Sequence, residues 1–256
     1  MASEERFGYE WDKYDFMDPI YEEQFKNWTG KPAEFWKGKD VLDAGCGMGR
    51  NSYWPLKYGA HSVIAFDNDE RSLASAKQTL AEFSHAKIER HDLSEIRWKN
   101  QFDIVMCIGV LHHVRRPELA LKNMVQSLRN DGELVIWVYS YEGNEWIVRF
   151  VNPIRKKITS RLPLPIVHFL SYLCSVPLWM FVKIFRGPTP YMKQLSSFTL
   201  QHVHCIVFDQ LIPSVANYWK KGEVESLAKS AGLKNFSVKK PKNNMGWILT
   251  AKKNSG

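Results

Sequence analysis

The sequence has few cysteines and no closely spaced cysteine pair. Its four cysteines are scattered over 256 residues and form no CxxC motif, which argues against a zinc knuckle and against a disulfide framework. The opening stretch, MASEERFGYEWDKYDF, is charged from its fourth residue and has no apolar run, so it does not have the pattern of a secretory signal. No internal repeat and no low-complexity linker is present. These absences favour a globular protein of the reducing cytoplasm.

The composition is that of a globular chain with an excess of positive charge. The chain is 45% hydrophobic and 24% charged, which excludes wholesale disorder. Its length suits one large α/β domain, or one domain with an insertion. The formal net charge is +8, and much of it lies around Arg149–Arg186 and after Lys234. Such a charge favours nucleic acid, an anionic membrane surface or a phosphorylated substrate, unless it serves solubility alone.

From Lys39 onward, apolar strands alternate with helical patterns. Strands are expected at DVLDAG, SVIAFD, AKIERHD, FDIVMCIG and GELVIWVYS, and helices at GRNSYWPLKYG, ERSLASAKQTLAEF and RPELALKNMVQSLRN. Near the end of the chain the helix KGEVESLAKSAGL precedes NFSVKKP and GWILTAKK, two strands joined by a short turn and therefore antiparallel. This alternation implies right-handed crossovers and a mostly parallel sheet with helices on both faces. We predict a Rossmann-like α/β fold with a seven-stranded mixed sheet.

The same pattern divides the chain into three parts. Residues 1–38 are expected to form an aromatic helical arm, residues 39–140 and 221–256 the sheet domain, and residues 141–220 a hydrophobic helical lid. The lid contains IVHFLSYLCSVPLWMFVKIF, residues 166–185, which is about long enough to cross a bilayer. One crossing would leave the fifth strand and the last helix on opposite sides of the membrane, although both must dock on one sheet. We therefore expect a buried lid helix or an amphipathic element in the membrane interface.

The motif that carries the chemistry is VLDAGCGMGR, in which a strand runs into a glycine-rich turn and a helix. Glycines let the backbone turn tightly and let a ligand approach closely. A GxGxxG dinucleotide fingerprint would need glycine at Arg50, so nicotinamide binding is disfavoured. The spacing DxGxGxG instead resembles motif I of the class I S-adenosylmethionine-dependent methyltransferases, and the alternative is a glycine turn without a ligand. The resemblance implies that the cofactor meets Asp43, Gly45, Cys46, Gly47 and Gly49.

Two further acids follow the next two strands. Asp67 ends the second strand, where a carboxylate can accept hydrogen bonds from both ribose hydroxyls, and Asn68 would border the adenine. In the resembling family the acid at Asp92 accepts from the adenine amino group and Leu93 contributes its backbone. Each acid alone could equally be a helix N-cap. Acids at the carboxyl ends of three successive strands favour one crevice that binds S-adenosylmethionine and releases S-adenosylhomocysteine.

The segment CIGVLHHVRRPELAL follows the fourth strand. In the resembling family it lies beneath the transferred methyl group, which implies backbone contacts from Ile108 and Gly109. The pair His112 and His113 suggests a metal, but adjacent residues rarely converge on one ion and no second cluster is evident. No metal is therefore expected. The open alternatives are a packing or capping role, or a substrate-orienting group or general base, for which His113 is the first candidate.

Acceptor recognition is expected from segments outside the sheet. FGYEWDKY, residues 7–14, and HVHCIVFDQLIPSVANYW, residues 202–219, resemble signatures of a bacterial methyltransferase subgroup that couples an FGxEW arm to a VFDQxxP lid. The polar residues within these largely apolar segments either line an acceptor pocket or fix the lid in place. The candidates are Glu10, His202, His204 and Asp209, of which His202 and Asp209 are also candidate catalytic residues.

The resemblance implies an enzyme that transfers a methyl group in line to an oxygen or nitrogen acceptor. Basic residues flank the apolar run within residues 150–186, a pattern typical of a helix pressed into anionic headgroups. The expected acceptor is therefore a small molecule or a lipid-linked compound, and an oligomer is left open.

The alternative is RNA modification, because GVLHHVRRP is similar to a segment of tRNA carboxymethyl transferases. Against RNA, the added segment is apolar where a phosphate track should be basic. A third possibility, a non-catalytic binding module, would predict a damaged glycine turn or a missing ribose acid, and neither is seen.

Overall fold

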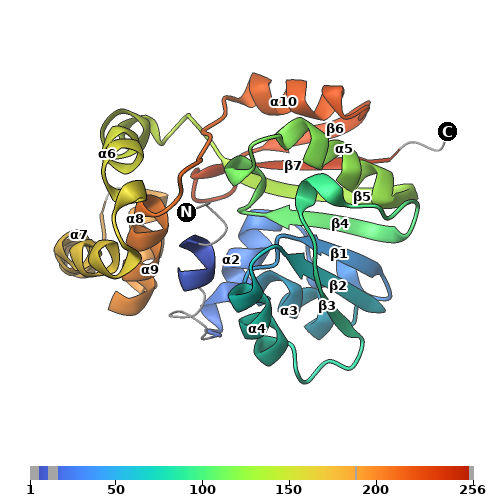
Figure 1. Cartoon of the computed structure of the whole chain (residues 1–256), viewed down its shortest axis with the longest axis horizontal. Coiled ribbons are helices and arrows are strands. Elements are labelled where there is room, and N and C mark those ends of the chain that lie inside the picture. The colour runs from blue at the N-terminus through green and yellow to red at the C-terminus, as the bar shows by residue number, and fades with distance from the viewer. Residues whose placement is uncertain (1–5, 11–16, 188, 254–256) are drawn as a thin grey trace.

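The structure is a computed structural model that describes residues 6–10, 17–187 and 189–253. A twisted sheet with helices on both faces forms one side of the molecule, and a group of helices lies beside it (Figure 1). This helical group comes from one insertion between the fifth strand and the last helix. The fold therefore separates a sheet domain from an added lid, and the site lies where the two meet.

The sheet has seven strands in the order β3-β2-β1-β4-β5-β7-β6. The strands are β1 (Asp40–Ala44), β2 (Ser62–Asp67), β3 (Ala86–Arg90), β4 (Phe102–Ile108), β5 (Leu128–Tyr139), β6 (Asn235–Lys239) and β7 (Gly246–Lys252). Strands β1 to β5 pair in parallel, and β7 runs antiparallel to both β5 and β6. The predicted mixed sheet with a terminal antiparallel pair is confirmed. The strand order reverses between β1 and β4, which is where open α/β sheets bind ligands.

The helices of the sheet domain cover two separate hydrophobic cores. They are α2 (Ile20–Thr29), α3 (Arg50–Lys57), α4 (Glu70–Thr79), α5 (Pro117–Ser127) and α10 (Lys221–Ser230), with short 3-10 helices η1 (Ala33–Trp36), η2 (Leu93–Glu95) and η3 (Leu111–His113). One core contains Leu121 of α5 and Val224 of α10. The other contains Phe25 of α2, Trp54 of α3 and Leu73 of α4. Since successive strand residues point to opposite faces, each face of the sheet has a core of its own.

The insertion is helical and has small cores of its own. It contains the π-helix η4 (Ile147–Val151), α6 (Asn152–Lys157), η5 (Thr159–Arg161), α7 (Leu164–Phe185), α8 (Pro190–Ser197) and α9 (Leu200–Leu211). One cluster includes Leu164 of α7 and Phe208 of α9, and another includes Val182 of α7 and Leu195 of α8. Helix α7 therefore packs through one side on α8 and α9, and most of the remainder of its surface points outward.

Two predicted helix ends were wrong. The helix expected up to Asn130 ends at Ser127, and β5 begins at Leu128. Leu128 is fully buried and pairs with Phe102, after which the register shifts and Asp131 adopts a positive φ of 64°. Such a bulge in a strand follows from sheet pairing, which helical periodicity cannot show. The helix expected to continue to residue 83 likewise stops at Thr79, and turns follow.

Residues 6–10 form a helical turn that joins the lid to the sheet domain. The side chain of Arg6 is buried and donates hydrogen bonds to three backbone carbonyls of the lid. These are the carbonyls of Thr159 at 2.8 Å, Leu162 at 3.2 Å and Ile212 at 2.7 Å. On the other side of the turn, Gly8 lies so close to Asp69 that a Cβ would overlap its carboxylate. The arm therefore holds two parts of the chain in register.

We expect Arg6→Ala to destabilise the fold by about 3 kcal/mol, because three buried carbonyls would lose a charged donor. Urea denaturation measures this free energy of unfolding. Arg90→Ala is the control, since Arg90 is exposed and pairs only with the exposed Glu70 and a backbone carbonyl, and it should cost less than about 1 kcal/mol. Equal losses for the two variants would contradict the role assigned to Arg6.

Candidate active site

A cavity of about 450 Å³ joins the carboxyl ends of the parallel strands to the lid. At the sheet end it is lined by the turns that follow β1, β2, β3 and β4. At the lid end it is lined by the arm, by α2 and by residues of η4, α7, α8 and α9. The cavity thus lies at the reversal of strand order, where a ligand is expected.

The glycine turn after β1 presents backbone to this cavity. Gly45, Cys46 and Gly47 line the wall, and the two glycines have φ of 84° and 53°, a left-handed conformation that other residues adopt only with strain. A Cβ at Gly45 would come within 2.7 Å of the side chain of Val110. The turn therefore needs glycine for its own shape, and that shape leaves a cradle into which the end of a ligand fits.

Two residues of the same motif lie outside the cavity wall, contrary to expectation. Asp43 is buried behind the turn, where Ser52 Oγ donates to its carboxylate at 2.6 Å. Burial raises the pKa of Asp43 to about 7, although the Ser52 hydrogen bond lowers it. Gly49 is the N-cap of α3, and a Cβ there would meet Ala76 of α4 at 3.3 Å and Leu80, which follows α4, at 3.2 Å. Both residues shape the turn from behind, because the turn itself stands between them and the cavity.

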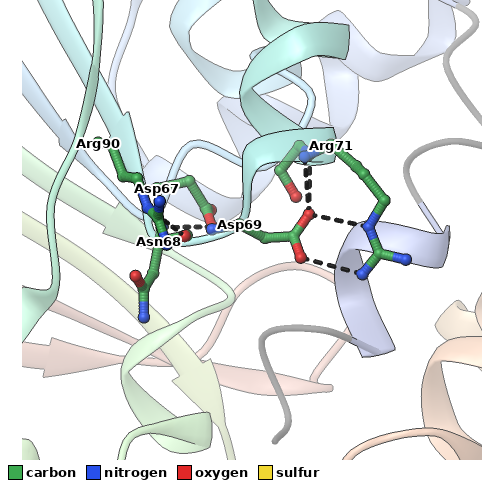
Figure 2. A network of polar contacts seen from close by, with 6 residues as sticks. Asp67, Asn68, Asp69, Arg71 and Arg90 are labelled. Atoms are coloured by element: carbon green, nitrogen blue, oxygen red, sulfur yellow. Dashed lines mark hydrogen bonds and ion pairs between the residues drawn. The ribbon is translucent and has the colours of Figure 1, made fainter. Parts of the chain in front are cut away.

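The carboxylate of Asp67 is fixed by three backbone donors. Its Oδ1 accepts from the N–H of Asn68 at 2.8 Å and of Asp69 at 3.1 Å. Its Oδ2 accepts from the N–H of Gly47 at 3.0 Å. Figure 2 shows how Asp67, Asn68 and Asp69 lie. Burial raises the pKa of Asp67 while these three hydrogen bonds lower it. A carboxylate offers about four acceptor sites, so one site on Oδ2 remains for a ligand hydroxyl.

The N-cap alternative fails for Asp67, because the neighbouring Asp69 caps α4. The Asp69 carboxylate accepts from the N–H of Arg71 at 2.9 Å and of Ser72 at 3.2 Å, and it pairs with the Arg71 guanidinium at 3.0 Å (Figure 2). Asp67 is thus free of a capping role, although it ends the strand only two residues earlier. Since Asp67 does not cap a helix, its carboxylate in the cavity wall is available to accept a hydrogen bond from a ligand.

For Asp92 the N-cap alternative is correct, yet the residue also lines the cavity. Its side chain accepts from the N–H of Ser94 at 2.7 Å at the start of η2. The Asn68 amide approaches the same carboxylate at 3.5 Å. Asn68, Asp92 and Leu93 all line the cavity, as do Ile108 and Gly109 at the end of β4. The predicted residues after three of the strands are therefore brought to one wall.

His113 lies on the cavity wall in an orientation that suits a base. Its Nδ1 is 2.7 Å from the carbonyl oxygen of Val215, and because a carbonyl only accepts, Nδ1 carries the hydrogen and Nε2 has the free lone pair. The ring of Phe7 packs against it at 4.8 Å between centroids. Burial lowers the pKa of His113 to about 4, against the opposing effect of the Val215 hydrogen bond. The imidazole is therefore neutral at pH 7.

His112 is not part of the cavity wall, so the expectation that it acts on the substrate is not supported. It lies behind Tyr139, with 3.8 Å between ring centroids. Neither ring nitrogen has a hydrogen-bond partner among the described residues. Burial lowers its pKa well below the usual value, with smaller contributions from the charges of His113 and Arg155. Its environment is that of a packed core residue.

We expect His112→Phe to stabilise the protein relative to wild type as the solution becomes acidic. The unfolded chain binds a proton at His112 below about pH 6.5, whereas the folded state resists it, so wild type loses stability as pH falls. The difference between the two proteins should grow by about 1.4 kcal/mol per pH unit below pH 6.5. Urea denaturation between pH 7 and pH 5 measures it, and a difference independent of pH would contradict the buried neutral ring.

Two carboxyl groups line the lid end of the cavity, the half-buried Asp209 and the buried Glu10. Asp209 accepts a hydrogen bond from the Tyr139 hydroxyl at 2.8 Å, and burial raises its pKa to about 6. Glu10 accepts from Cys205 Sγ at 3.2 Å, and burial, followed by the charge of Asp209, raises its pKa well above the usual range. The guanidinium of Arg50 also lines this wall and lowers the pKa of both acids. These groups can orient a polar head of an acceptor inside an apolar chamber.

The two histidines of α9 have different surroundings. His202 lines the cavity, stacks on Phe198 at 4.9 Å between centroids, and lies 3.9 Å from the carboxylate of Asp18. His204 is outside the wall, and its Nε2 is 3.1 Å from the carbonyl oxygen of His168 on α7. His204 therefore fixes the lid, as the alternative interpretation had it, while His202 has access to an acceptor.

Sequence reasoning missed Arg50 and Tyr139. Arg50 occupies the position where a dinucleotide fingerprint has glycine, and it follows the turn directly, so its place at the wall could have been inferred. Tyr139 ends β5, and the carboxyl ends of parallel strands meet at one edge. Within residues 6–10, 17–187 and 189–253, no group of three His, Cys, Asp or Glu is close enough to hold a metal ion. Trp11, the last residue of FGxEW, lies outside the described residues.

Comparison with known proteins agrees with this geometry. Residues 42–136 match the family model described as a methyltransferase domain. Two curated relatives are named tRNA U34 carboxymethyltransferase. That of Helicobacter pylori is 32% identical over 112 residues, which is 41% of this chain and 42% of the relative. That of Campylobacter hominis is 28% identical over 164 residues, which is 62% of this chain and 57% of the relative. The chain thus spans about half the length of these relatives.

A solved structure extends the likeness of fold to the whole sheet. Human N-acetylserotonin methyltransferase, in complex with S-adenosylmethionine, superposes with a TM-score of 0.56 at 14% identity, covering 92% of this chain and 53% of the human one. At this identity the likeness concerns the fold. The FGxEW and VFDQxxP signatures find no counterpart in the matched names. Residues 42–136 therefore resemble a methyltransferase domain, and the sheet has the fold of a methyltransferase that binds S-adenosylmethionine.

Proposed function

We propose that the protein transfers a methyl group from S-adenosylmethionine to an oxygen or nitrogen of a small-molecule or lipid-linked acceptor. This proposal rests on one continuous cavity that joins the sheet end to the lid end. Its sheet end has the backbone cradle and the fixed carboxylate that a nucleoside-containing donor needs, and its lid end is a largely apolar chamber with a few polar groups. Donor and acceptor can therefore meet in one space.

The donor would be held by the residues that line the sheet end. S-adenosylmethionine supplies a methyl group on a sulfonium, which an acceptor displaces in line. Oδ2 of Asp67 would accept a hydrogen bond from a ribose hydroxyl, and the glycine turn would lie against the amino-acid portion. The full set is Gly45, Cys46, Gly47, Asp67, Asn68, Asp92, Leu93, Ile108 and Gly109. Alignment by such a rigid wall contributes up to roughly 7–11 kcal/mol to the lowering of the barrier.

His113 would take the proton that an oxygen or nitrogen acceptor loses as it attacks. Its Nε2 lone pair is available because Nδ1–H is bonded to Val215. The neighbouring acids serve a different purpose, since Tyr139 donates to Asp209 and Cys205 donates to Glu10. We assign Asp209 and His202 to positioning of the acceptor. In this proposal His113 accepts the proton, and Asp209 and His202 recognise the acceptor.

A second candidate function is carboxymethyl transfer to tRNA. It is favoured by the names of the curated relatives and by their identities of 32% and 28%. It is disfavoured by the lid, because its exposed aliphatic side chains would stay in water beside a nucleic acid. The matches cover 41% and 62% of this chain.

Transfer of labelled methyl into fractionated host pools tests the proposed acceptor. Purified protein and S-adenosylmethionine labelled in the methyl group are incubated with lipid, RNA and metabolite fractions, and Asp67→Ala serves as the blank. We expect label in the lipid or metabolite fraction. Label confined to RNA would overturn the proposed acceptor and point to RNA methylation. No label in any fraction with wild type would contradict methyl transfer. Carboxymethyl transfer needs a donor that itself carries a carboxymethyl group, because the methyl group of S-adenosylmethionine lacks the carboxylate carbon.

A further inference from the structure

The outer surface of the lid is apolar. Fourteen large apolar side chains are exposed in the described part of the chain, and thirteen of them lie between Trp146 and Phe185. We call these thirteen the apolar face. They are Trp146, Phe150, Ile154, Ile158, Ile166, Phe169, Leu170, Tyr172, Leu173, Met180, Phe181, Ile184 and Phe185. The remaining one, Leu119, is on α5. A concentration of this kind on one element marks an interaction surface.

Helix α7 is apolar on its outer side as well as on its packed side. Val167, Ser171, Ser175 and Val182 are buried on the side that packs on the lid. On the opposite side, Phe169, Leu173 and Ile184 are 70%, 67% and 68% exposed. An ordinary surface helix places charged residues there. Water is therefore an unfavourable environment for this side of α7.

By length and composition alone, α7 could cross a membrane, with a mean hydropathy of 1.6 over its most apolar window. Two observations favour an orientation in the plane of the interface. One side of α7 packs on α8 and α9, and the chain on both sides of the lid returns to the same sheet. Only 22% of the apolar window is buried, so α7 is not the core helix of the lid either.

The segment before α7 continues the apolar face. Trp146, Phe150, Ile154 and Ile158 recur every four residues and are between 50% and 60% exposed, which places them on one side of the helical segment η4–α6. In Figure 1, α6 and α7 both lie at the end of the molecule farthest from β6 and β3, at the left. The two elements thus present exposed apolar side chains at the same end of the protein.

The charge of the lid complements an anionic surface. Residues 146–208 contain eight Lys and Arg and no Asp or Glu. The whole chain has 35 basic and 27 acidic residues, so this segment accounts for the entire net charge of +8. Seven of the eight are exposed, namely Arg149, Lys156, Lys157, Arg161, Lys183, Arg186 and Lys193. None of the seven forms an ion pair with another described residue.

The wall of the cavity reaches the apolar face. Its wall includes Trp146 and Val151 from the η4 segment and Cys174 and Leu178 from α7. Trp146 is itself 58% exposed and belongs to the apolar face, and Cys174 is also exposed. These residues connect the chamber to the outer surface through apolar side chains. An acceptor dissolved in lipid would reach the donor through them without crossing water.

We propose that the apolar face docks the protein on an anionic lipid bilayer, with α7 in the plane of the interface and the mouth of the cavity against the lipid. The proposal rests on the proposed function in one respect, the use of the cavity for an acceptor that arrives from the membrane. Apolar side chains would enter the acyl boundary, and the unpaired basic residues around them would contact headgroup phosphates. The protein would then be cytoplasmic and peripherally membrane-associated.

Two other occupants fit these observations less well. A second copy of the chain would bring seven unpaired basic residues against seven others in a two-fold contact, and like charges across an interface are unfavourable. RNA would satisfy the basic residues but would leave the aliphatic side chains of the apolar face in water. Only an anionic bilayer provides both hydrocarbon and negative charge.

Co-sedimentation with vesicles tests the proposal. Vesicles of phosphatidylcholine with about 30 mol% phosphatidylglycerol are compared with pure phosphatidylcholine at low salt. We expect wild type to bind the anionic vesicles at least roughly tenfold more strongly than the neutral ones. The double variant Phe169→Glu/Leu173→Glu should lose binding by roughly tenfold or more. Its matched control is Leu119→Glu, which places a charge on the exposed apolar residue of α5 and should bind as wild type does.

The basic residues are tested in the same assay. Lys156→Glu/Lys157→Glu should weaken binding to anionic vesicles by roughly tenfold or more and leave binding to neutral vesicles unchanged. Lys77→Glu on α4 is the control and should have no effect. Calorimetric titration with S-adenosylhomocysteine is run on each variant, and its affinity should match that of wild type because none of these side chains lines the donor end of the cavity.

Each outcome bears on one proposal. Wild type that stays in the supernatant with both vesicle types overturns the docking surface, while its binding of S-adenosylhomocysteine would leave the methyltransferase proposal intact. Vesicle binding without binding of S-adenosylhomocysteine would support the docking surface and contradict the methyltransferase proposal. A dimer in light scattering that dissociates in Phe169→Glu/Leu173→Glu would assign the apolar face to a second copy and overturn membrane docking. Binding of tRNA by wild type that is lost in Lys156→Glu/Lys157→Glu would also overturn membrane docking.

Discussion

Asp67→Ala weakens the binding of S-adenosylhomocysteine by roughly 30- to 1,000-fold, or about 2–4 kcal/mol, if Asp67 holds the ribose. A ribose hydroxyl of the ligand would lose a charged acceptor that backbone donors have fixed in place before binding. Charge-assisted hydrogen bonds to a pre-organised group are the strong ones. Isothermal titration calorimetry of wild type and variant measures the change.

The control must separate ligand binding from folding, since Asp67 also accepts from the N–H of Gly47. Asp67→Asn keeps one acceptor oxygen and should bind with intermediate affinity. Asp131→Asn changes a carboxylate near the amino end of β5, away from the cavity, and Asn tolerates the positive φ found there. It should bind as wild type does. If Asp67→Ala melts at the wild-type temperature and binds the ligand equally well, the assignment of Asp67 is wrong.

His113→Phe lowers kcat by roughly 10²- to 10⁴-fold, the usual contribution of a positioned base, while the affinity for S-adenosylhomocysteine stays near that of wild type. Phenylalanine preserves the packing against Phe7 and removes the lone pair of Nε2. Steady-state rates with the acceptor identified from the labelled pools measure the effect. His61→Phe, a change at an exposed histidine of the sheet domain, should leave kcat unchanged.

The lowered pKa of His113 gives this prediction a second readout. With a pKa of about 4, His113 stays neutral from pH 7 to pH 5.5, whereas an unperturbed histidine would lose about tenfold in its neutral fraction. The ratio of wild-type to His113→Phe rates cancels the titration of Asp209 and Glu10, which line the same cavity. That ratio should be constant over this range. A tenfold fall toward pH 5.5, or a variant as active as wild type, would contradict His113 as a base.

The sheet and the donor end of the cavity could be predicted because their signals are local. Apolar strands, turn glycines and an acid at the end of a strand each depend on a few neighbouring residues, and parallel pairing then brings the strand ends together. The boundary at Leu128 could not be predicted, because it depends on pairing with Phe102 across the sheet. Asp43 shows the same limit, since only the packed structure reveals that the turn stands between it and the cavity.

The lid end depended on contacts that the sequence does not reveal. Arg6 bonds to carbonyls more than 150 positions away, and no local pattern indicates such a partner. Helix α7 is apolar on nearly every side, so its periodicity could not tell which side would pack on α9 and which would remain outside. A buried lid helix was one expectation from the sequence. The exposure of Phe169 and Leu173 contradicts it. The interfacial alternative stays a prediction.

A crystal structure of the protein grown with S-adenosylhomocysteine tests the central assignment most directly. It should show a ribose hydroxyl within hydrogen-bond distance of Asp67 and the amino-acid portion against the turn from Gly45 to Gly47. Ligand density in another part of the molecule, or an empty crevice in crystals of protein that binds the compound in solution, would contradict the account.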